Sequence, residues 1–198
     1  MLEGAPQGPR QRAKMALIPF KLTYEEFCQL PESVLPHELI DGELRMSAAP
    51  SWKHQETLGN IHDPVRRHAR GGRLGRVAMA PIDVVLDPDR PLVLQPDLVF
   101  VGQDRIGIIR DKVYGAPDLV VEISSANGAL FDRTEKAALY AQYGVREYWL
   151  VDPEAETVEV RRLAPGGYES LGLFRRGDVV RSLVLPDLRL AVDDIFAA

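Results

Sequence analysis

Three ionisable side chains lie in successive segments whose other residues are mostly apolar and are expected in the hydrophobic core. Asp97 follows Pro96 at the head of an apolar run, Glu122 lies inside Asp118-Leu-Val-Val-Glu122-Ile-Ser-Ser125, and Lys136 falls on the helix expected next. Buried ionised groups are costly unless they pair with one another or hold a metal. Two carboxylates without Cys or His in ligand spacing suit Mg²⁺, with Mn²⁺ as a possible substitute. The pattern predicts a phosphodiesterase site, in which Asp97 and Glu122 bind the metal and Lys136 assists the attacking water.

The alternative for the same residues is a structural cluster of ion pairs, because such networks also occupy buried positions. The two interpretations make the same demand on the fold, since the three groups must meet in either case. They differ in what the cluster does, and residue types alone leave both open.

The elements around these residues can bring them together. Side chains alternate along a strand, so Glu122 shares a face with Val120, and Asp97 shares a face with Val99. If the two strands are neighbours, the two carboxylates converge. Fourteen residues separate Glu122 from Lys136, enough for a loop and a first helical turn. The inward stripe predicted for that helix comprises Lys136, Leu139, Tyr140 and Tyr143.

The remaining pattern predicts an α/β domain with a mixed central sheet, flanking helices and a C-terminal antiparallel extension. Residues 1–15 are expected to be disordered and 16–198 to form one domain. A helix over 54–70 should kink or split at Pro64. An Asp41-Gly42 turn predicts a hairpin over 38–46. The strands are expected at 77–86 (interrupted by Pro81, which suggests an edge or a bulge), 92–101, 118–124 and 146–151, before the hairpins.

Composition sets outer limits on the function. The net charge is −5, with 45% hydrophobic and 27% charged residues. An acidic net charge argues against binding of nucleic acid over the whole protein surface, because phosphate binding depends on Lys and Arg. No apolar run approaches the roughly 20 residues of a membrane span. A single cysteine, Cys28, fits a reducing compartment, and a cytoplasmic location is expected.

Five arginines occur between positions 66 and 76. They could form a local basic rim around the metal site, or they could be the solvated end of a helix, where cations favour the helix dipole. Both interpretations stay open. The set comprises Arg66, Arg67, Arg70, Arg73 and Arg76.

A set of motifs follows in a fixed order along the chain: Glu38-Leu-Ile-Asp-Gly42-Glu-Leu and the helix near His54, Pro96-Asp97-Leu-Val, Asp118 to Ser125, Asp132 to Lys136 with Tyr140, Gly144-Val145, and Arg146-Glu-Tyr-Trp149-Leu-Val-Asp152-Pro. In this order the motifs resemble the Uma-type family of endonucleases, which belongs to the PD-(D/E)XK superfamily with its restriction-endonuclease-like core. The resemblance covers roughly residues 23–196.

The resemblance implies that Asp97 and Glu122 are the metal-binding acids. The lysine of the superfamily motif would stand two residues after Glu122, where this chain has Ser124, and Lys136 on the following helix takes its place. An additional upstream acid is implied, with Glu38 as the candidate and Glu56 in reserve. Nucleic acid, with DNA as the first choice, is the implied partner.

Other polar residues are expected to be structural. His54 could reach the site, but helix capping or a core hydrogen bond is the preferred interpretation. Asp118 shares a face with Glu122 but lies about 13 Å away along the strand, outside direct metal contact. Cys28 is expected to be a small packed hydrophobe. Tyr148 and Trp149 are expected in the core.

Two rival functions remain. One is a non-catalytic nuclease-fold module for dimerisation or nucleic-acid binding, favoured by the acidic net charge and the displaced lysine. The other is a phosphodiesterase acting on a small nucleotide. Edge-to-edge pairing of the hairpins after Tyr168 would give a homodimer.

Overall fold

The protein is described by a computed structural model over residues 21–31, 37–124 and 132–197. The N-terminal half contains α1 (Tyr24–Cys28), β1 (His37–Ile40), β2 (Glu43–Met46), α2 (Trp52–Gly71), β3 (Gly75–Met79), β4 (Val84–Asp87), β5 (Leu92–Leu94), β6 (Leu98–Gly102), the 3₁₀-helix η1 (Gln103–Ile108) and β7 (Val113–Tyr114). The C-terminal half contains β8 (Leu119–Ile123), the π-helical turn η2 (Asp132–Lys136), α4 (Ala137–Tyr143), β9 (Glu147–Asp152), β10 (Thr157–Ala164), β11 (Gly167–Phe174), β12 (Val179–Arg181), β13 (Arg189–Ala191) and α5 (Val192–Ile195).

The central sheet has six strands in the order β11-β10-β9-β8-β6-β3. Strand β8 runs parallel to β9, whereas the other neighbours are antiparallel. The prediction of an α/β fold with a mixed sheet, flanking helices and an antiparallel C-terminal extension is therefore confirmed.

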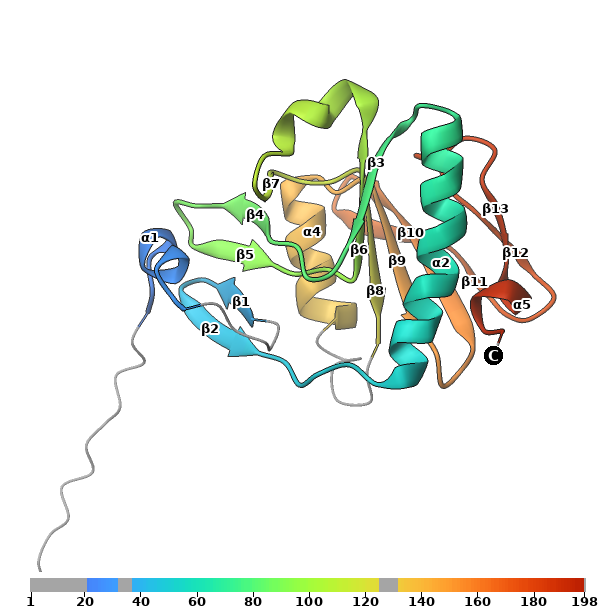
Figure 1. The fold of residues 1–198 in the computed structure, drawn as a ribbon, viewed down its shortest axis with the longest axis horizontal. Helices are drawn as coiled ribbons and strands as arrows, with labels where there is room; N and C mark the ends of the chain where they lie inside the picture. Colours follow the sequence, from blue (N-terminus) through green and yellow to red (C-terminus); the bar gives the residue numbers. More distant parts are fainter. Residues whose placement is uncertain (1–20, 32–36, 125–131, 198) are drawn as a thin grey trace, which may run out of the picture.

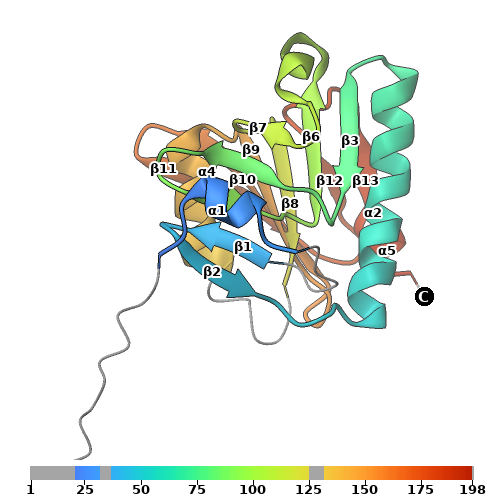
Figure 2. The same ribbon diagram turned by 60° about the vertical axis from the view of Figure 1, so that its left-hand side comes forward.

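Helices cover both faces of this sheet, with α2 and α4 on opposite sides of β8 (Figures 1 and 2). The α2 side buries Ile61 and Val65 against Val121 of β8. The α4 side buries Tyr140 against Val120. Because β8 is covered on both faces, all five of its residues are buried, which explains its nearly continuous apolar sequence.

A second sheet shares the α4 side. Its five strands run in the order β2-β1-β5-β4-β7. The β1–β2 hairpin turns at Asp41 and Gly42, whose φ angles of 52° and 83° match the type I′ turn predicted from this dipeptide. Side chains from this second sheet, including Ile40, Val84 and Leu94, enter the same core cluster as Tyr140.

The predicted strand over 92–101 is wrong, because the chain forms two strands there. Strand β5 belongs to the second sheet and β6 to the central sheet, and residues Gln95, Pro96 and Asp97 carry the chain between them. Proline donates no backbone hydrogen bond and so interrupts a ladder. The predicted strand over 77–86 divides in the same way near Pro81, and the part before it, β3, is an edge strand as expected.

Two local expectations also differ from the structure. Helix α2 continues past Pro64 as one helix of 20 residues, with the Ser51 side chain accepting the His54 backbone N–H at 3.2 Å, so Pro64 does not split it. Cys28 is exposed at the end of α1, because the buried residue of that short helix is Phe27. The expectation of a packed cysteine is therefore wrong.

The described helices include none that is both long and apolar enough to cross a bilayer. The segment 1–15, expected to be disordered, lies outside the described residues.

Candidate active site

Glu122 is a buried acid of the central sheet. It is the fourth residue of β8 and is 3% exposed, and strand alternation turns its side chain toward α4. Its Oε1 accepts hydrogen bonds from Lys136 Nζ at 3.1 Å and from the Tyr140 hydroxyl at 2.7 Å. Hydrogen bonds of this kind are what allows a carboxylate to stay buried.

Lys136 lies on the inward stripe predicted for its helix. It ends η2, immediately before α4, and is 6% exposed. Its Nζ lies 2.9 Å from Glu38 Oε1 as well as 3.1 Å from Glu122 Oε1. Two carboxylates from different sheets therefore face one ammonium group.

Glu38 is the upstream acid that joins this cluster. It lies on β1, is 6% exposed, and its Oε1 also accepts the backbone N–H of Gln95 at 2.9 Å. The reserve candidate, Glu56, is half-buried on α2, the helix that covers the other face of the sheet. Of the two upstream acids, the structure brings Glu38 to Lys136.

Asp97 stands beside Glu122 at the end of the adjoining strand. The antiparallel register pairs Leu98 with Val121, so Asp97 precedes β6 next to Glu122 on β8. Asp97 Oδ2 accepts the backbone N–H of Ile123 at 2.7 Å, and Oδ1 lies 3.1 Å from His54 Nε2. The strands that carry Asp97 and Glu122 are therefore neighbours, as the prediction required. In Figure 1 this is the lower end of β8, beside the first turn of α2.

The predicted residues thus fall into two adjoining groups. Glu38, Glu122 and Lys136 form direct contacts, whereas Asp97 reaches the same strand end through the Ile123 amide. Two further residues complete these groups. Tyr140 was placed on the inward stripe without a role. A reach of His54 into the site was the less favoured interpretation, behind helix capping or a core hydrogen bond.

The Tyr140 hydroxyl is held as a neutral donor. Burial raises its pKa well above the usual value, and the nearby charges of Glu122 and Glu38 raise it further. The phenol therefore keeps its proton at any physiological pH and donates a hydrogen bond to Glu122.

The donor chemistry of the two site acids is compatible with Mg²⁺. Across the described residues, no three Asp, Glu, His or Cys side chains cluster closely enough to form a metal site by themselves. Mg²⁺ does not require such a cage, because it is commonly held by one or two carboxylates together with water and substrate phosphate. The carboxylates of Asp97 and Glu122 stand at adjoining strand ends and are hard oxygen donors of the kind that Mg²⁺ prefers.

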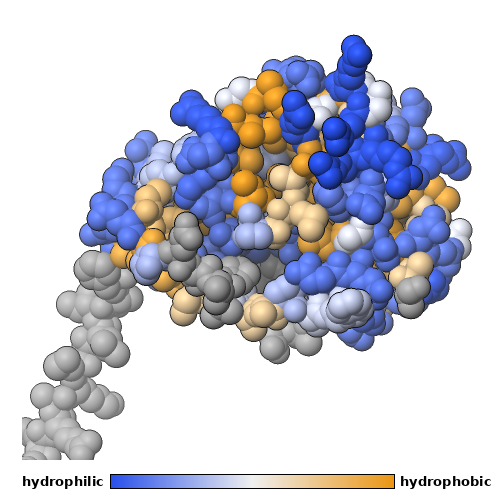
Figure 3. Space-filling view, viewed as in Figure 1, coloured by the Kyte–Doolittle hydropathy of each residue, from blue (hydrophilic) through white to orange (hydrophobic). Residues whose placement is uncertain are grey.

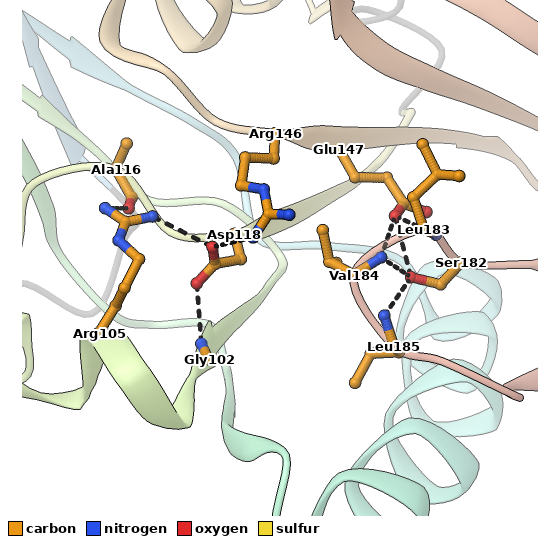
Figure 4. Close-up of polar contacts among 10 residues, drawn as sticks. All are labelled: Gly102, Arg105, Ala116, Asp118, Arg146, Glu147, Ser182, Leu183, Val184 and Leu185. Atoms are coloured by element: carbon orange, nitrogen blue, oxygen red, sulfur yellow. Dashed lines mark hydrogen bonds and ion pairs between the residues drawn. The ribbon is translucent and has the colours of Figure 1, made fainter.

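Asp118 and Glu147 build separate structural centres (Figure 4). Asp118 precedes β8 at its other end and accepts from the Gly102 amide, Arg105 and Arg146, as expected for an acid outside the site. The fully buried Glu147 accepts from Trp149 Nε1, the Ser182 hydroxyl and the Leu183 and Val184 amides. Tyr148 and Trp149 are fully buried, which confirms their assignment to the core.

The five arginines do not surround the candidate site. They are exposed in the last turns of α2, in the following turn and at the start of β3. His54, in the first turn of α2, marks the site, and a helix of 20 residues spans about 30 Å. The interpretation of these arginines as a rim of the metal site is wrong.

The mixed sheet with helices on both faces is shared with a protein of known structure. That structure, from Anabaena variabilis ATCC 29413, is described as "a putative nuclease belonging to DUF820". The two superimpose with a TM-score of 0.76 at 22% identity, covering 89% of this chain and 98% of the other, which establishes the common fold.

The family follows from the sequence match. Residues 24–193 match the Uma2 family, described as "Putative restriction endonuclease", and the chain belongs to this family. No protein with a curated description matches the chain.

Proposed function

We propose that the protein is a Mg²⁺-dependent endonuclease that hydrolyses phosphodiester bonds in nucleic acid, with DNA as the substrate. One observation carries the proposal: a buried lysine lies between two buried glutamates, at the strand end where Asp97 adjoins them. The descriptions of the Uma2 family and of the Anabaena variabilis protein as nucleases support the same reaction class.

In this proposal Asp97 and Glu122 would hold Mg²⁺, and the bound ion would supply polarisation of a phosphoryl oxygen and a lowered pKa for the attacking water. Mn²⁺ can replace it, because carboxylate and water ligands also suit that ion. Lys136 donates from its ammonium group to the attacking water or to the phosphate oxygen that gains charge. Glu38 orients Lys136, Tyr140 orients Glu122, and His54 orients Asp97.

The direct test is cleavage of plasmid DNA, single-stranded DNA and RNA with Mg²⁺ or Mn²⁺. We expect cutting by the wild-type protein and loss of cutting in Asp97→Ala, whereas Asp63→Asn, an exposed carboxylate on α2, should cut normally. Equal residual cutting by wild type and Asp97→Ala would remove the assignment.

A non-catalytic nuclease-fold module is the second candidate. It is favoured by the ammonium group already bound to both glutamates, by Ser124 in place of the motif lysine and by the net charge of −5. Calorimetric titration with Mn²⁺ discriminates between the two. No binding, together with unchanged stability of Glu122→Gln, would point to the non-catalytic module.

We also propose a homodimer in the cytoplasm. Strand β11 is an edge of the central sheet, and its Leu171 and Leu173 are 40% and 42% exposed. Unpaired edges with apolar side chains favour pairing with another strand. Light scattering of the wild type and of Leu171→Lys tests the pairing, which the charge should prevent.

A further inference from the structure

A hollow separate from the candidate site lies on the α4 side of the central sheet. It has a volume of about 340 Å³, within the range of ligand pockets. Ala78, Val99 and Val101 of β3 and β6 form its floor, and Ile106 and Ile109 contribute a wall. Figure 3 shows hydrophobic atoms gathered in this upper part of the face, between η1 and β3, with hydrophilic atoms around them.

The charged residues that line this cavity are all cations: Arg76, Arg110 and Lys112. Lys112 pairs with Asp83 at 2.6 Å. The ion pairs formed within the described residues include none for Arg76 or Arg110, and both are exposed. In a chain of net charge −5, a cavity lined by cations and aliphatic groups is complementary to an anion.

We propose that this cavity binds a compact anion with an apolar body. The apolar body would contact the aliphatic floor and wall, and a single carboxylate or phosphate would bind the guanidinium groups of Arg76 and Arg110. Two sources could supply this chemistry: a free amphipathic carboxylate, or a nucleotide whose base faces pack on the aliphatic side chains. The proposal does not depend on the nuclease activity.

The cavity is linked to the candidate site by consecutive hydrogen bonds. Lys112 Nζ bonds Asp83 Oδ2, and Asp83 Oδ1 accepts from Gln95 Nε2 at 2.7 Å. The Gln95 backbone N–H then donates to Glu38, which binds Lys136. An anion that attracts Lys112 therefore competes with Asp83 at the first bond of a chain that ends at the candidate site.

Calorimetric titration of the full chain with octanoate, thymidine 5′-monophosphate and inorganic phosphate tests the proposal. We expect octanoate or the nucleotide to bind and inorganic phosphate not to bind, and the probe that binds identifies the source. Arg110→Gln should weaken that binding about 10- to 100-fold, because a charge-assisted hydrogen bond is lost. Arg67→Gln, which alters an exposed arginine of α2 outside the cavity, is the control and should bind as the wild type does.

A cavity-filling variant, Ala78→Leu, tests the place of the apolar body. Ala78→Leu should abolish binding of the probe, and the variant should still unfold in a cooperative thermal transition. If Ala78→Leu fails to fold, Arg110→Gln still tests the site, because Arg110 is exposed. The proposal is overturned if neither amphipathic probe binds, if inorganic phosphate binds equally well, or if Arg110→Gln binds as the wild type does. Because binding is read without cleavage, an inactive protein that binds a probe would refute the proposed function and leave this site in place.

Discussion

His54 Nε2 lies 3.1 Å from Asp97 Oδ1, and this contact joins α2 to the strand that adjoins Glu122. Since the other oxygen of Asp97 accepts the Ile123 amide, both carboxylate oxygens have a partner that fixes their direction. Groups of this kind, one step removed from a metal, orient the ligands that contact it.

Replacing His54 should therefore weaken metal binding at the proposed site without unfolding the protein. We expect His54→Ala to bind Mn²⁺ about 10- to 100-fold more weakly, as is typical when a residue that orients a ligand is removed. Calorimetric titration with Mn²⁺ provides the measurement. His68→Ala on the same helix is the matched control, and equal Mn²⁺ affinity in the two variants would contradict an orienting role for His54.

Lys136→Met should be strongly destabilising. The change removes the ammonium group between Glu38 and Glu122 and leaves buried carboxylates behind, which costs about 3–5 kcal/mol for a broken buried pair. Urea denaturation at pH 7 measures the loss. Adding Glu38→Gln to Lys136→Met should recover part of the stability, and a single variant as stable as wild type would show that the ion pairs contribute little.

Tyr140→Phe removes one hydroxyl and keeps the ring. We expect the free energy of unfolding to fall by about 1.5–3 kcal/mol, the usual contribution of a hydrogen bond to a charged group. A double-mutant cycle with Glu122→Gln isolates this bond, because its loss should cost less once the carboxylate is neutral. Additive effects of the two changes would argue against the contact.

Glu147 should give the stability a distinctive dependence on pH. Burial raises its pKa above the usual value of 4.5, in opposition to hydrogen bonds from Trp149, Ser182 and two amides that lower it. The folded state then binds the proton more tightly than the unfolded state does. This contribution is fully present below pH 4.5 and is lost as the pH rises through the raised pKa.

The comparison with Glu147→Gln isolates that contribution, because the glutamine does not titrate. Between pH 4 and pH 7 the unfolding free energy of wild type should decline relative to the variant, by at most about 1.4 kcal/mol per pH unit. Urea titrations at each pH measure the difference. A difference that is independent of pH, or that changes in the opposite direction, would refute the raised pKa.

The contact between Glu122 and Lys136 was predictable because two local periodicities specify it. Strand alternation gives the face of Glu122, and the helical stripe gives the face of Lys136, so the sequence needed only the packing of α4 on β8 to bring them together. The hairpin at Asp41-Gly42 followed in the same way from local turn chemistry.

Contacts between elements that are distant in sequence were not predictable in this way. The apolar run over 92–101 reads as one strand, and nothing local reveals that β5 and β6 enter different sheets, although Pro96 signals an interruption. The contact of His54 with Asp97 depends on where α2 begins relative to β6. The distance of the arginines at 66–76 from the candidate site depends on the direction in which α2 runs. The burial of Glu147 depends on amides at residues 183 and 184, more than thirty residues later.

Lys136 forms ion pairs with Glu38 of one sheet and Glu122 of the other, so it connects the two sheets directly. A displacement of one sheet relative to the other would break at least one of these two ion pairs before the hydrogen bonds between the strands of either sheet were lost. Heat or mild denaturant should therefore disrupt this cluster while most strands are still intact. Loss of the cluster would be an early sign that the two sheets have begun to separate.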